Sequence, residues 1–457
     1  MANSRVAGRS PSAQILRSPH AWLIVFSWLG LVLAGIRDTS PIFYPYRWWF
    51  IALLAISLLG ILTRIKAVRY CAEHRCLLAY LAVAALSCAV SLMPEYSFAR
   101  WCTLLLMFIA VFIGAWSFAQ WRQHFRLLVN LAVASACIGA IFSSWYILEA
   151  GQLIPQTRFT GAFGKATGAG SFAAASIPLI LWRLRYSSGW TKVFFGSVFG
   201  ILLYMLFFSG GRAAIVGGLF ALAIWTWKHV QGLRPAMAGG IFSLIFLTTA
   251  GVLTLDMLPE YIIRRESLPT FTGRIPLWKV GISLFLESPV IGHGYGMTRY
   301  IRKYSDYEEH LEGKIVPVPV GFLDLIPGFG TAPLGRATLH SDHVERLVET
   351  GLLGYVPFAL LWYFILRRIA AVFWLPATPD SSLAMALGLN VSYVFLDSFM
   401  HGALFALNAP GVLLAWVAIV MFMRASELAV VGCGYRACTS STLSTASIRG
   451  PVVLATR

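Results

Sequence analysis

One stretch of the sequence, residues 339–354, combines histidines and acidic residues at spacings that could do chemistry. His340, His343 and Glu345 lie close together there. A histidine can take a proton from a hydroxyl group near neutral pH, as a general base must. Asp342 and Glu345 have the spacing of a capping box, which predicts a helix beginning here and places His340 just before it. His340 is the candidate base, with His343 and Glu345 as competitors, and a capping or interfacial histidine is the alternative.

A second stretch places an arginine at the start of a predicted helix. Residues 272–287 have a capping threonine, a proline in the first turn and an apolar face, which predicts a helix lying along a membrane surface. Arg274 lies at its N-terminal end, where free N–H groups favour an anion and a guanidinium suits phosphate. The alternative is that Arg274 simply pairs with a loop carboxylate or a lipid headgroup. The glycine-rich run at 291–296 predicts a tight turn rather than a phosphate site, because no strand precedes it.

Two further places carry ionisable residues next to apolar runs. Arg212 closes a short turn between two such runs, where it could meet lipid phosphate or simply snorkel. Asp397 and His401 are four residues apart near the end of another run, so they could bond to each other on one helix face. Ionisable residues in membrane segments are functional candidates, although here we favour a structural pair.

The elements that position these residues must be transmembrane helices. The chain has 457 residues, of which 58% are hydrophobic and 12% charged, against about 25% charged in an average soluble protein. A soluble globule is therefore excluded, and the fold class is an all-α polytopic membrane protein. The net charge of +17 indicates membrane orientation rather than nucleic-acid binding. The seven cysteines lack zinc spacing, so no metal site is predicted.

Hydropathy predicts about 12 transmembrane helices. Their approximate ranges are 21–36, 48–63, 76–93, 101–121, 127–149, 171–182, 193–209, 213–227, 236–255, 351–366, 383–399 and 405–423. The short connections on one side carry 16 Lys and Arg residues and those on the other carry 6. Both termini are therefore predicted to be cytoplasmic.

This topology divides the chain into five parts. They are a cytoplasmic N-terminus (1–20), transmembrane helices 1–9 (21–255), a large periplasmic loop carrying helices (256–350), transmembrane helices 10–12 (351–423) and a flexible cytoplasmic tail (424–457). The loop has 95 residues and holds 12 of the 19 acidic residues. A polar segment of this length indicates function rather than a passive connection.

Four short motifs occur in one order around this loop. They are Arg158 to Phe163, Ser209-Gly210-Gly211-Arg212, Arg274 to Trp278 followed by Ser288 to Gly294, and His340-Ser341 followed by Glu349 to Gly354. This set resembles the O-antigen ligase and O-antigen polymerase superfamily of bacterial envelope glycosyltransferases. Two departures are Gly210-Gly211, where the family has a second serine before the arginine, and Ser341, where asparagine is commoner.

The resemblance implies a GT-C-like fold in the bacterial inner membrane and an active site on the periplasmic face. It implies metal-independent, inverting transfer of a glycan from an undecaprenyl-diphosphate-linked donor to a sugar hydroxyl. His340 would be the base, and Arg212, Arg274 and Arg158 would bind the diphosphate. No cofactor is implied. The acceptor is a lipid-linked repeat or lipid A-core, with a slight preference for the polymerase or exopolysaccharide role over the ligase.

The sequence leaves two other classes of function open. A twelve-span transporter is the main alternative, but transporters carry ionisable residues at mid-membrane, and these apolar runs are nearly free of them. A non-catalytic scaffold of envelope synthesis is the other. The expected partners are the donor and acceptor, membrane lipids and other polysaccharide assembly proteins, with no nucleic acid.

Overall fold

The computed structural model describes residues 19–59, 71–150, 155, 157–229, 274–304, 312–315, 339–400 and 410–444. The helices of the N-terminal half are α2 (Pro19–Ala34), α3 (Ser40–Phe43), α4 (Arg47–Leu59), α5 (Ala72–Ala89), α6 (Pro94–Phe108), the π-helix η2 (Ile109–Ala115), α7 (Trp116–Ala119) and α8 (Arg122–Ala150). The next are the 3-10 helix η3 (Gly161–Phe163), α9 (Ala166–Tyr186), α10 (Gly189–Phe208) and α11 (Arg212–His229). The remaining elements are α14 (Arg274–Glu287), η5 (Met297–Tyr300), β1 (Ile301–Tyr304), β2 (Glu312–Ile315), α16 (Asp342–Phe373), α17 (Pro379–Met400) and α18 (Pro410–Ser444).

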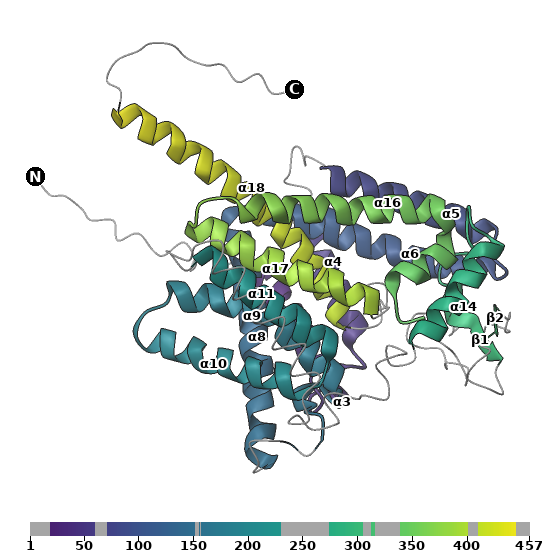
Figure 1. Ribbon diagram of the computed structural model, residues 1–457, viewed down its shortest axis with the longest axis horizontal. Helices are drawn as coiled ribbons and strands as arrows, with labels where there is room; N and C mark the ends of the chain where they lie inside the picture. Colours follow the sequence, from purple (N-terminus) through teal and green to yellow (C-terminus); the bar gives the residue numbers. More distant parts are fainter. Residues whose placement is uncertain are drawn as a thin grey trace, which may run out of the picture.

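The long helices form one bundle, and α14 lies at the end of the molecule opposite to the C-terminal end of α18 (Figure 1). Seven described helices are long and apolar enough to cross a membrane. They are Ala72–Ala89, Pro94–Ala119, Arg122–Glu149, Gly189–Phe208, Asp342–Phe373, Pro379–Met400 and Val412–Val431. Two shorter apolar helices, Ala21–Ala34 and Arg47–Ser57, accompany them. The chain is therefore a multi-pass membrane protein, while the number twelve stays a prediction.

Every predicted span inside the described residues coincides with a helix, whereas the span at 236–255 lies outside them. The sixth predicted span, 171–182, was the shortest in sequence, yet α9 is 21 residues long and contains Pro178. Its alanine-rich sequence favours helix, and a proline is tolerated in a membrane helix because neighbouring helices can satisfy the freed carbonyl.

The helix after His340 begins as predicted but is capped differently. The N-cap is Ser341, whose hydroxyl accepts from the backbone N–H of Val344, so the prediction that Asp342 is the capping residue is wrong by one position. The helix continues into the tenth predicted span, but its backbone is broken at Gly351, where φ is +58°. Because only glycine adopts this conformation at little cost, Gly351 sets the kink.

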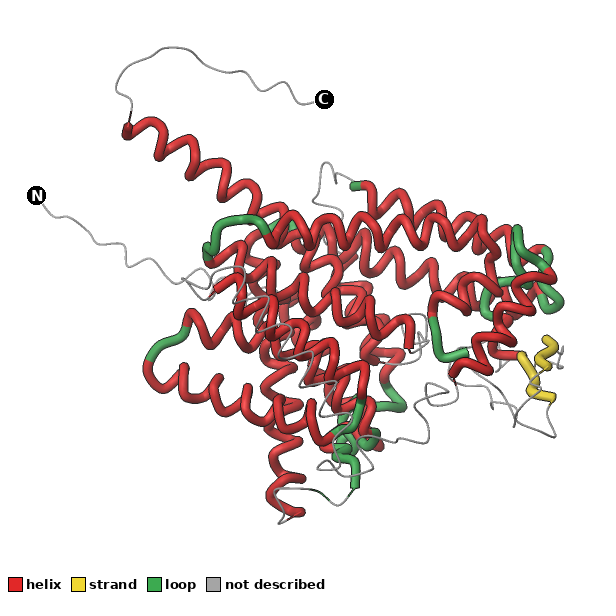
Figure 2. Tube along the Cα trace, viewed as in Figure 1, coloured by secondary structure: helices red, strands yellow, loops and turns green. Residues whose placement is uncertain are grey.

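Two further differences from the sequence prediction concern the loop and the tail. The loop contains a two-stranded antiparallel hairpin in which β1 pairs with β2, and Figure 2 shows it at one edge of an otherwise helical fold. At the other end, α18 continues to Ser444, well beyond the position near residue 423 where the last span was predicted to end. Adding residues to an existing helix is easier than starting a new one, so the small residues of the predicted tail can continue α18.

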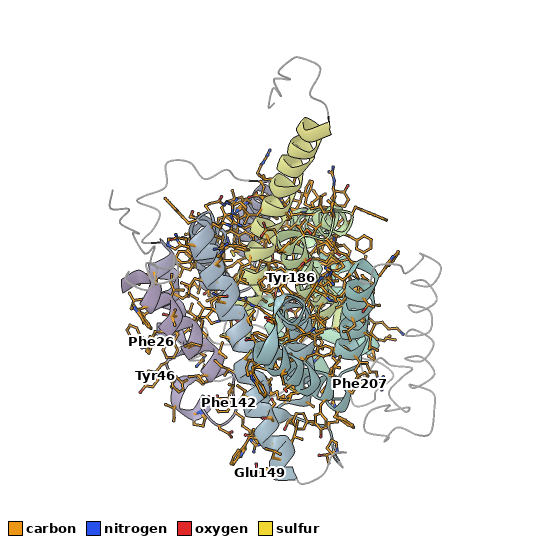
Figure 3. All side chains as sticks on the ribbon, turned by 90° about the vertical axis from the view of Figure 1, so that its left-hand side faces the viewer. Phe26, Tyr46, Phe142, Glu149, Tyr186 and Phe207 are labelled. Atoms are coloured by element: carbon orange, nitrogen blue, oxygen red, sulfur yellow. The ribbon has the colours of Figure 1, made fainter. Side chains whose placement is uncertain are left out.

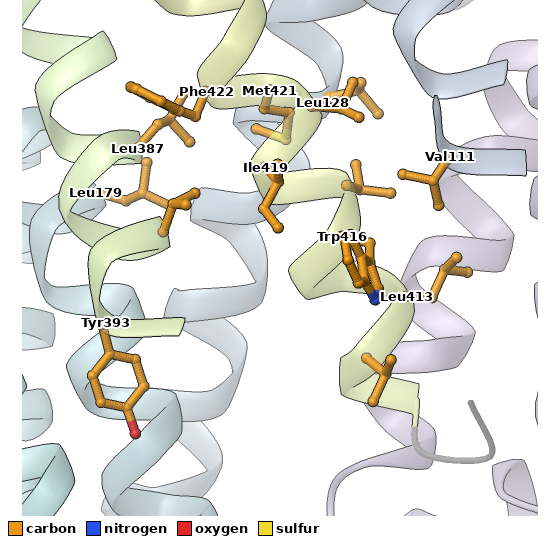
Figure 4. Close-up of a cluster of buried hydrophobic side chains, with 14 of the residues drawn as sticks. Val111, Leu128, Leu179, Leu387, Tyr393, Leu413, Trp416, Ile419, Met421 and Phe422 are labelled. Atoms are coloured by element: carbon orange, nitrogen blue, oxygen red, sulfur yellow. The ribbon is translucent and has the colours of Figure 1, made fainter. Parts of the chain in front are cut away.

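The apolar core joins helices from both ends of the chain. Val111 of η2, Leu128 of α8, Leu179 of α9 and Leu387 of α17 are buried with Trp416 of α18 in one cluster (Figure 4). Helices far apart in sequence are therefore held together, so the loops that connect them can lie close to one another in space.

Candidate functional site

Two of the predicted arginines lie at one turn. The Nε of Arg158 donates a 2.8 Å hydrogen bond to the carbonyl oxygen of Ser209, and Arg212 begins α11 three residues later. The backbone N–H of Phe159 also bonds to the carbonyl oxygen of Phe208, so the loop before α9 is fastened to the end of α10. The turn itself depends on glycine, since Gly210 has a φ of +61°.

The same turn touches α9. A Cβ atom on Gly170 would lie 2.4 Å from Oγ of the buried Ser209, so only glycine allows this approach. The next residue, Ser171, lies 2.7 Å from the hydroxyl of Tyr393, which in turn lies 3.2 Å from Oδ1 of Asp397. A series of contacts therefore links the arginine turn to the end of α17.

A cavity of about 430 Å³ lies beside this series of contacts. Most of its lining is apolar, from α2, α8, α9, α17 and α18, but Asp342, Asp397, Ser171 and Tyr393 also line it. Figure 4 shows the Tyr393 ring at the edge of the core with its hydroxyl pointing away from the apolar side chains. The cavity thus combines a lipid-like interior with a few polar groups, as small-molecule sites commonly do.

Arg274 lies beside the polar end of α17. Its Nη1 is 3.9 Å from the sulfur of Met400. Partial burial lowers the pKa of the Arg274 guanidinium, and the nearby Asp397 carboxylate acts in the opposite direction. The structure therefore brings Arg274 and Asp397 together, whereas His401, the sequence-predicted partner of Asp397, lies outside the described residues.

The helix that carries Arg274 is confirmed over 274–287 and packs on the first half of α16. Val280 and Leu284 of α14 are buried against Leu339 and Val348. Gly281 allows the two helices to approach closely, because a Cβ atom there would lie 2.4 Å from Cγ1 of Val344. This packing positions Arg274 and the segment that begins at His340 relative to each other.

His340 is exposed and has an unusual backbone. Among the described residues other than glycine, it alone has a positive φ, +52°. Such a conformation costs about 1 kcal/mol or more and is found more often at functional sites than elsewhere. The residues on either side of it are well anchored, since Leu339 is buried and Ser341 caps α16.

The two competitors of His340 are occupied elsewhere. His343 is buried, stacks on Phe399 at 3.8 Å between ring centroids, and bonds to the hydroxyls of Tyr355 and Ser398. It therefore joins α16 to α17. Glu345 bonds to Arg346 at 3.5 Å and belongs to a buried ionic network. These contacts favour structural roles for both residues.

That network ties α16 to two other segments. Arg346 is buried, forms an ion pair with Glu349 at 2.7 Å and donates a hydrogen bond to the hydroxyl of Tyr80 on α5 at 3.2 Å. Its guanidinium also lies over the ring of Tyr295 at 5.2 Å, and Thr298 donates to Glu349. A buried ion pair needs several such partners to offset its loss of hydration.

The glycine-rich run forms a tight turn, as predicted. Gly292 and Gly294 have φ values of +78° and +108°. The backbone N–H groups of His293 and Gly294 donate to the carbonyl oxygens of Val348 and Glu349, so they already have acceptors within the chain. His293 also has a partner that the sequence did not indicate, because its Nε2 lies 2.7 Å from the carbonyl oxygen of Leu284.

The sequence missed the residues that connect the motifs. Tyr393, Ser171 and Asp342 line the cavity, and Arg346 anchors the helix after His340. Serine and tyrosine within apolar runs are common, so their spacing carried no signal. Arg346 did carry one, since an arginine three residues before a glutamate on one helix can form an ion pair with it.

These features together define a multi-pass helical membrane protein with arginines, an exposed histidine and a partly polar cavity supplied by segments far apart in sequence. Residues 197–359 match the family model Wzy_C, described as O-Antigen ligase. The match confirms the resemblance to the O-antigen ligase and polymerase superfamily, and its range includes Arg212, Arg274 and His340 but not Arg158. No curated protein is significantly similar to the chain.

Proposed function

We propose that this protein is an inner-membrane glycosyltransferase that moves a glycan from an undecaprenyl-diphosphate donor to a sugar hydroxyl on the periplasmic face. The observation that carries the proposal is the cavity of about 430 Å³ with Asp342 and Asp397 in its lining. Arg274 lies beside Asp397, and His340 is two residues before Asp342. An apolar chain suits the cavity, and a diphosphate at its polar end suits an arginine.

In this mechanism the exposed imidazole of His340 accepts the proton of the acceptor hydroxyl as its oxygen attacks the anomeric carbon. The bond from that carbon to the diphosphate oxygen breaks, and undecaprenyl diphosphate leaves with the electron pair. Attack opposite the leaving group inverts the anomeric carbon. Arg212 and Arg274 stabilise the charge on the leaving group, which is the contribution that a metal ion makes in other transferases.

Arg158 holds the turn at Ser209 and adds positive charge near Arg212. His343, Glu345 and Asp397 have structural partners, so we assign them positioning rather than catalytic roles. The acceptor is a lipid-linked repeat or lipid A-core. Both reactions need the same donor site, and we retain the slight preference for a polymerase.

The test is complementation of a deletion strain with His340→Ala, Arg212→Ala and Arg274→Ala. Each variant should insert into the membrane but fail to restore surface glycan. The matched control is Arg122→Ala, because the Arg122 side chain is 66% exposed at the start of α8. Normal glycan in all three site variants would refute the mechanism.

The gel pattern of the deletion strain separates the two acceptors. Core carrying one repeat indicates loss of a polymerase, and bare core indicates loss of a ligase. Unchanged lipopolysaccharide with lost capsule or slime indicates another polysaccharide. Substrate uptake into liposomes without glycan transfer would instead favour the transporter.

A further inference from the structure

Two hollows at one end of the bundle have no part in the transfer step described above. The first has a volume of about 520 Å³ and is lined by Arg37, Asp38, Trp145, Tyr146 and Glu149. The second, of about 420 Å³, is lined by residues of the connection from α2 to α4 together with Phe163, Gly164 and Lys165. Figure 3 shows Glu149 at the lower end of the molecule, well away from Tyr186.

Shared lining residues place these hollows next to the cavity of the proposed site. Arg37 lines both hollows. Gly35 and Phe163 line the second hollow and also the cavity that contains Asp342 and Asp397. The two hollows and the cavity therefore adjoin one another between the proposed reaction site and the end of α8.

The wall of these hollows is fastened to the arginine turn. The backbone N–H of Arg37 donates to the carbonyl oxygen of Ala162, within the loop whose Arg158 bonds to Ser209. The hollows thus lie at the same end of the helices as Arg212. By the count of basic residues this end faces the periplasm, where a lipid-linked glycan would extend.

The first hollow has the groups that bind a sugar. Trp145 is 68% exposed and offers an apolar, rigid surface to the C–H face of a pyranose ring. The Tyr146 hydroxyl donates to Oδ1 of Asp38, which fixes the carboxylate. Asp38 and Glu149 accept hydrogen bonds from sugar hydroxyls, and Arg37 donates them.

The side chains of this hollow suit sugar hydroxyls better than a lipid phosphate. Two carboxylates, Asp38 and Glu149, accompany one guanidinium, that of Arg37. A phosphate could use only the guanidinium, whereas neutral hydroxyl groups use both kinds of side chain, because carboxylates accept hydrogen bonds and a guanidinium donates them. The partly basic second hollow, with Arg37 and Lys165, lies between this site and the cavity.

We propose that the two hollows form a glycan-binding groove, which holds sugar units of the lipid-linked donor away from the bond that reacts. This inference rests on the proposed function and deepens it, because it assigns a binding site to the non-reacting part of the glycan. Trp145 and Glu149 are its specificity-determining residues.

The test measures binding without turnover. Full-length protein in nanodiscs is titrated with oligosaccharide released by mild acid from the surface polysaccharide of the strain. Trp145→Ala and Glu149→Gln should each weaken binding about tenfold, as loss of a central contact does, while Trp145→Phe should retain part of it. Trp190→Ala is the matched control, since Trp190 is 88% exposed at the start of α10. Unchanged oligosaccharide binding by Trp145→Ala, or an equal loss of binding in Trp190→Ala, would refute the proposal that the groove binds glycan.

A second measurement separates this inference from the proposed function. His340→Ala should bind the oligosaccharide as the wild type does but fail in transfer. If His340→Ala still transfers while Trp145→Ala loses binding, the mechanism fails and the groove stands. If His340→Ala is inactive and Trp145→Ala binds normally, the groove fails alone. Binding of phosphatidylglycerol in place of oligosaccharide, and its loss in Trp145→Ala, would also overturn the groove.

Discussion

The hydroxyl of Tyr393 lies 3.2 Å from Oδ1 of Asp397 on the same helix. It also lies 2.7 Å from Ser171, which follows the glycine that contacts Ser209. One side chain therefore joins the end of α17, near Arg274, to the turn that precedes Arg212. The two predicted diphosphate-binding arginines come from separate motifs, and Tyr393 is part of what aligns them.

Removal of that hydroxyl should weaken transfer without unfolding the protein. Tyr393→Phe keeps the ring but loses contacts worth about 1 kcal/mol each, so glycan transfer should fall about fivefold to thirtyfold. Quantified surface glycan in the complemented deletion strain measures this. Tyr363→Phe, at a residue that is 55% exposed, should have no effect. An equal loss in both variants would contradict the alignment role.

Arg158 should tolerate lysine poorly if its bond to Ser209 matters more than its charge. Arg158→Lys keeps the positive charge but cannot reproduce the 2.8 Å bond made by Nε. Both Arg158→Lys and Arg158→Ala should then lower transfer by a similar factor of about ten, corresponding to a charged hydrogen bond of roughly 1.5 kcal/mol. Full activity of the lysine variant would indicate a purely electrostatic role.

The glycine contacts that join the 288–296 turn to α16 should be essential to stability. A Cβ atom on Gly351 would lie 2.3 Å from the carbonyl oxygen of Val290, and one on Gly292 would lie 2.5 Å from the backbone of Glu349. Gly351→Ala and Gly292→Ala should each lower the free energy of unfolding by about 2 kcal/mol or more, from clash and positive φ together.

The control for these substitutions is Gly200→Ala, because a Cβ atom on Gly200 would meet no heavy atom within 4 Å. Gly200→Ala should leave the free energy of unfolding unchanged or raise it by up to about 1 kcal/mol, because alanine has a higher helix propensity than glycine. Thermal unfolding in detergent separates the variants. Equal melting temperatures for all three would show that the turn does not pack as described.

The buried pair of Arg346 and Glu349 should show strong coupling. Removing one member leaves the other charge buried, so Arg346→Met or Glu349→Gln should each cost about 3–5 kcal/mol. The double variant should cost less than the sum, because it removes the buried Glu349 charge together with the arginine that compensates it, and only Glu345 then loses a partner. Arg122→Ala, at a pair 3.9 Å apart with both side chains exposed, should change stability by less than about 1 kcal/mol. Additive losses in the double variant would exclude coupling.

Much of the architecture was predictable from local patterns. Apolar runs long enough to cross a bilayer indicated the helices, because an unpaired backbone is too costly in lipid for any other spanning segment. The helix at 274–287 and the tight turn at 291–296 followed from capping and glycine signals. The cap at Ser341 was missed because Ser341 and Asp342 are both good caps, and the sequence pattern did not distinguish them.

The sequence determined that the protein resides in a membrane, which residues carry charge beside apolar runs, and where His340 lies relative to a helix start. These are local properties, set by composition and by neighbours a few residues away. The tertiary structure decided which motifs meet. Arg158 bonds to Ser209, Arg274 lies near Asp397, and Trp145 shares a hollow with Arg37, because helices far apart in sequence pack through one core. The same packing turned His343 inward and left His340 exposed, since the face that each residue presents depends on the helices around it.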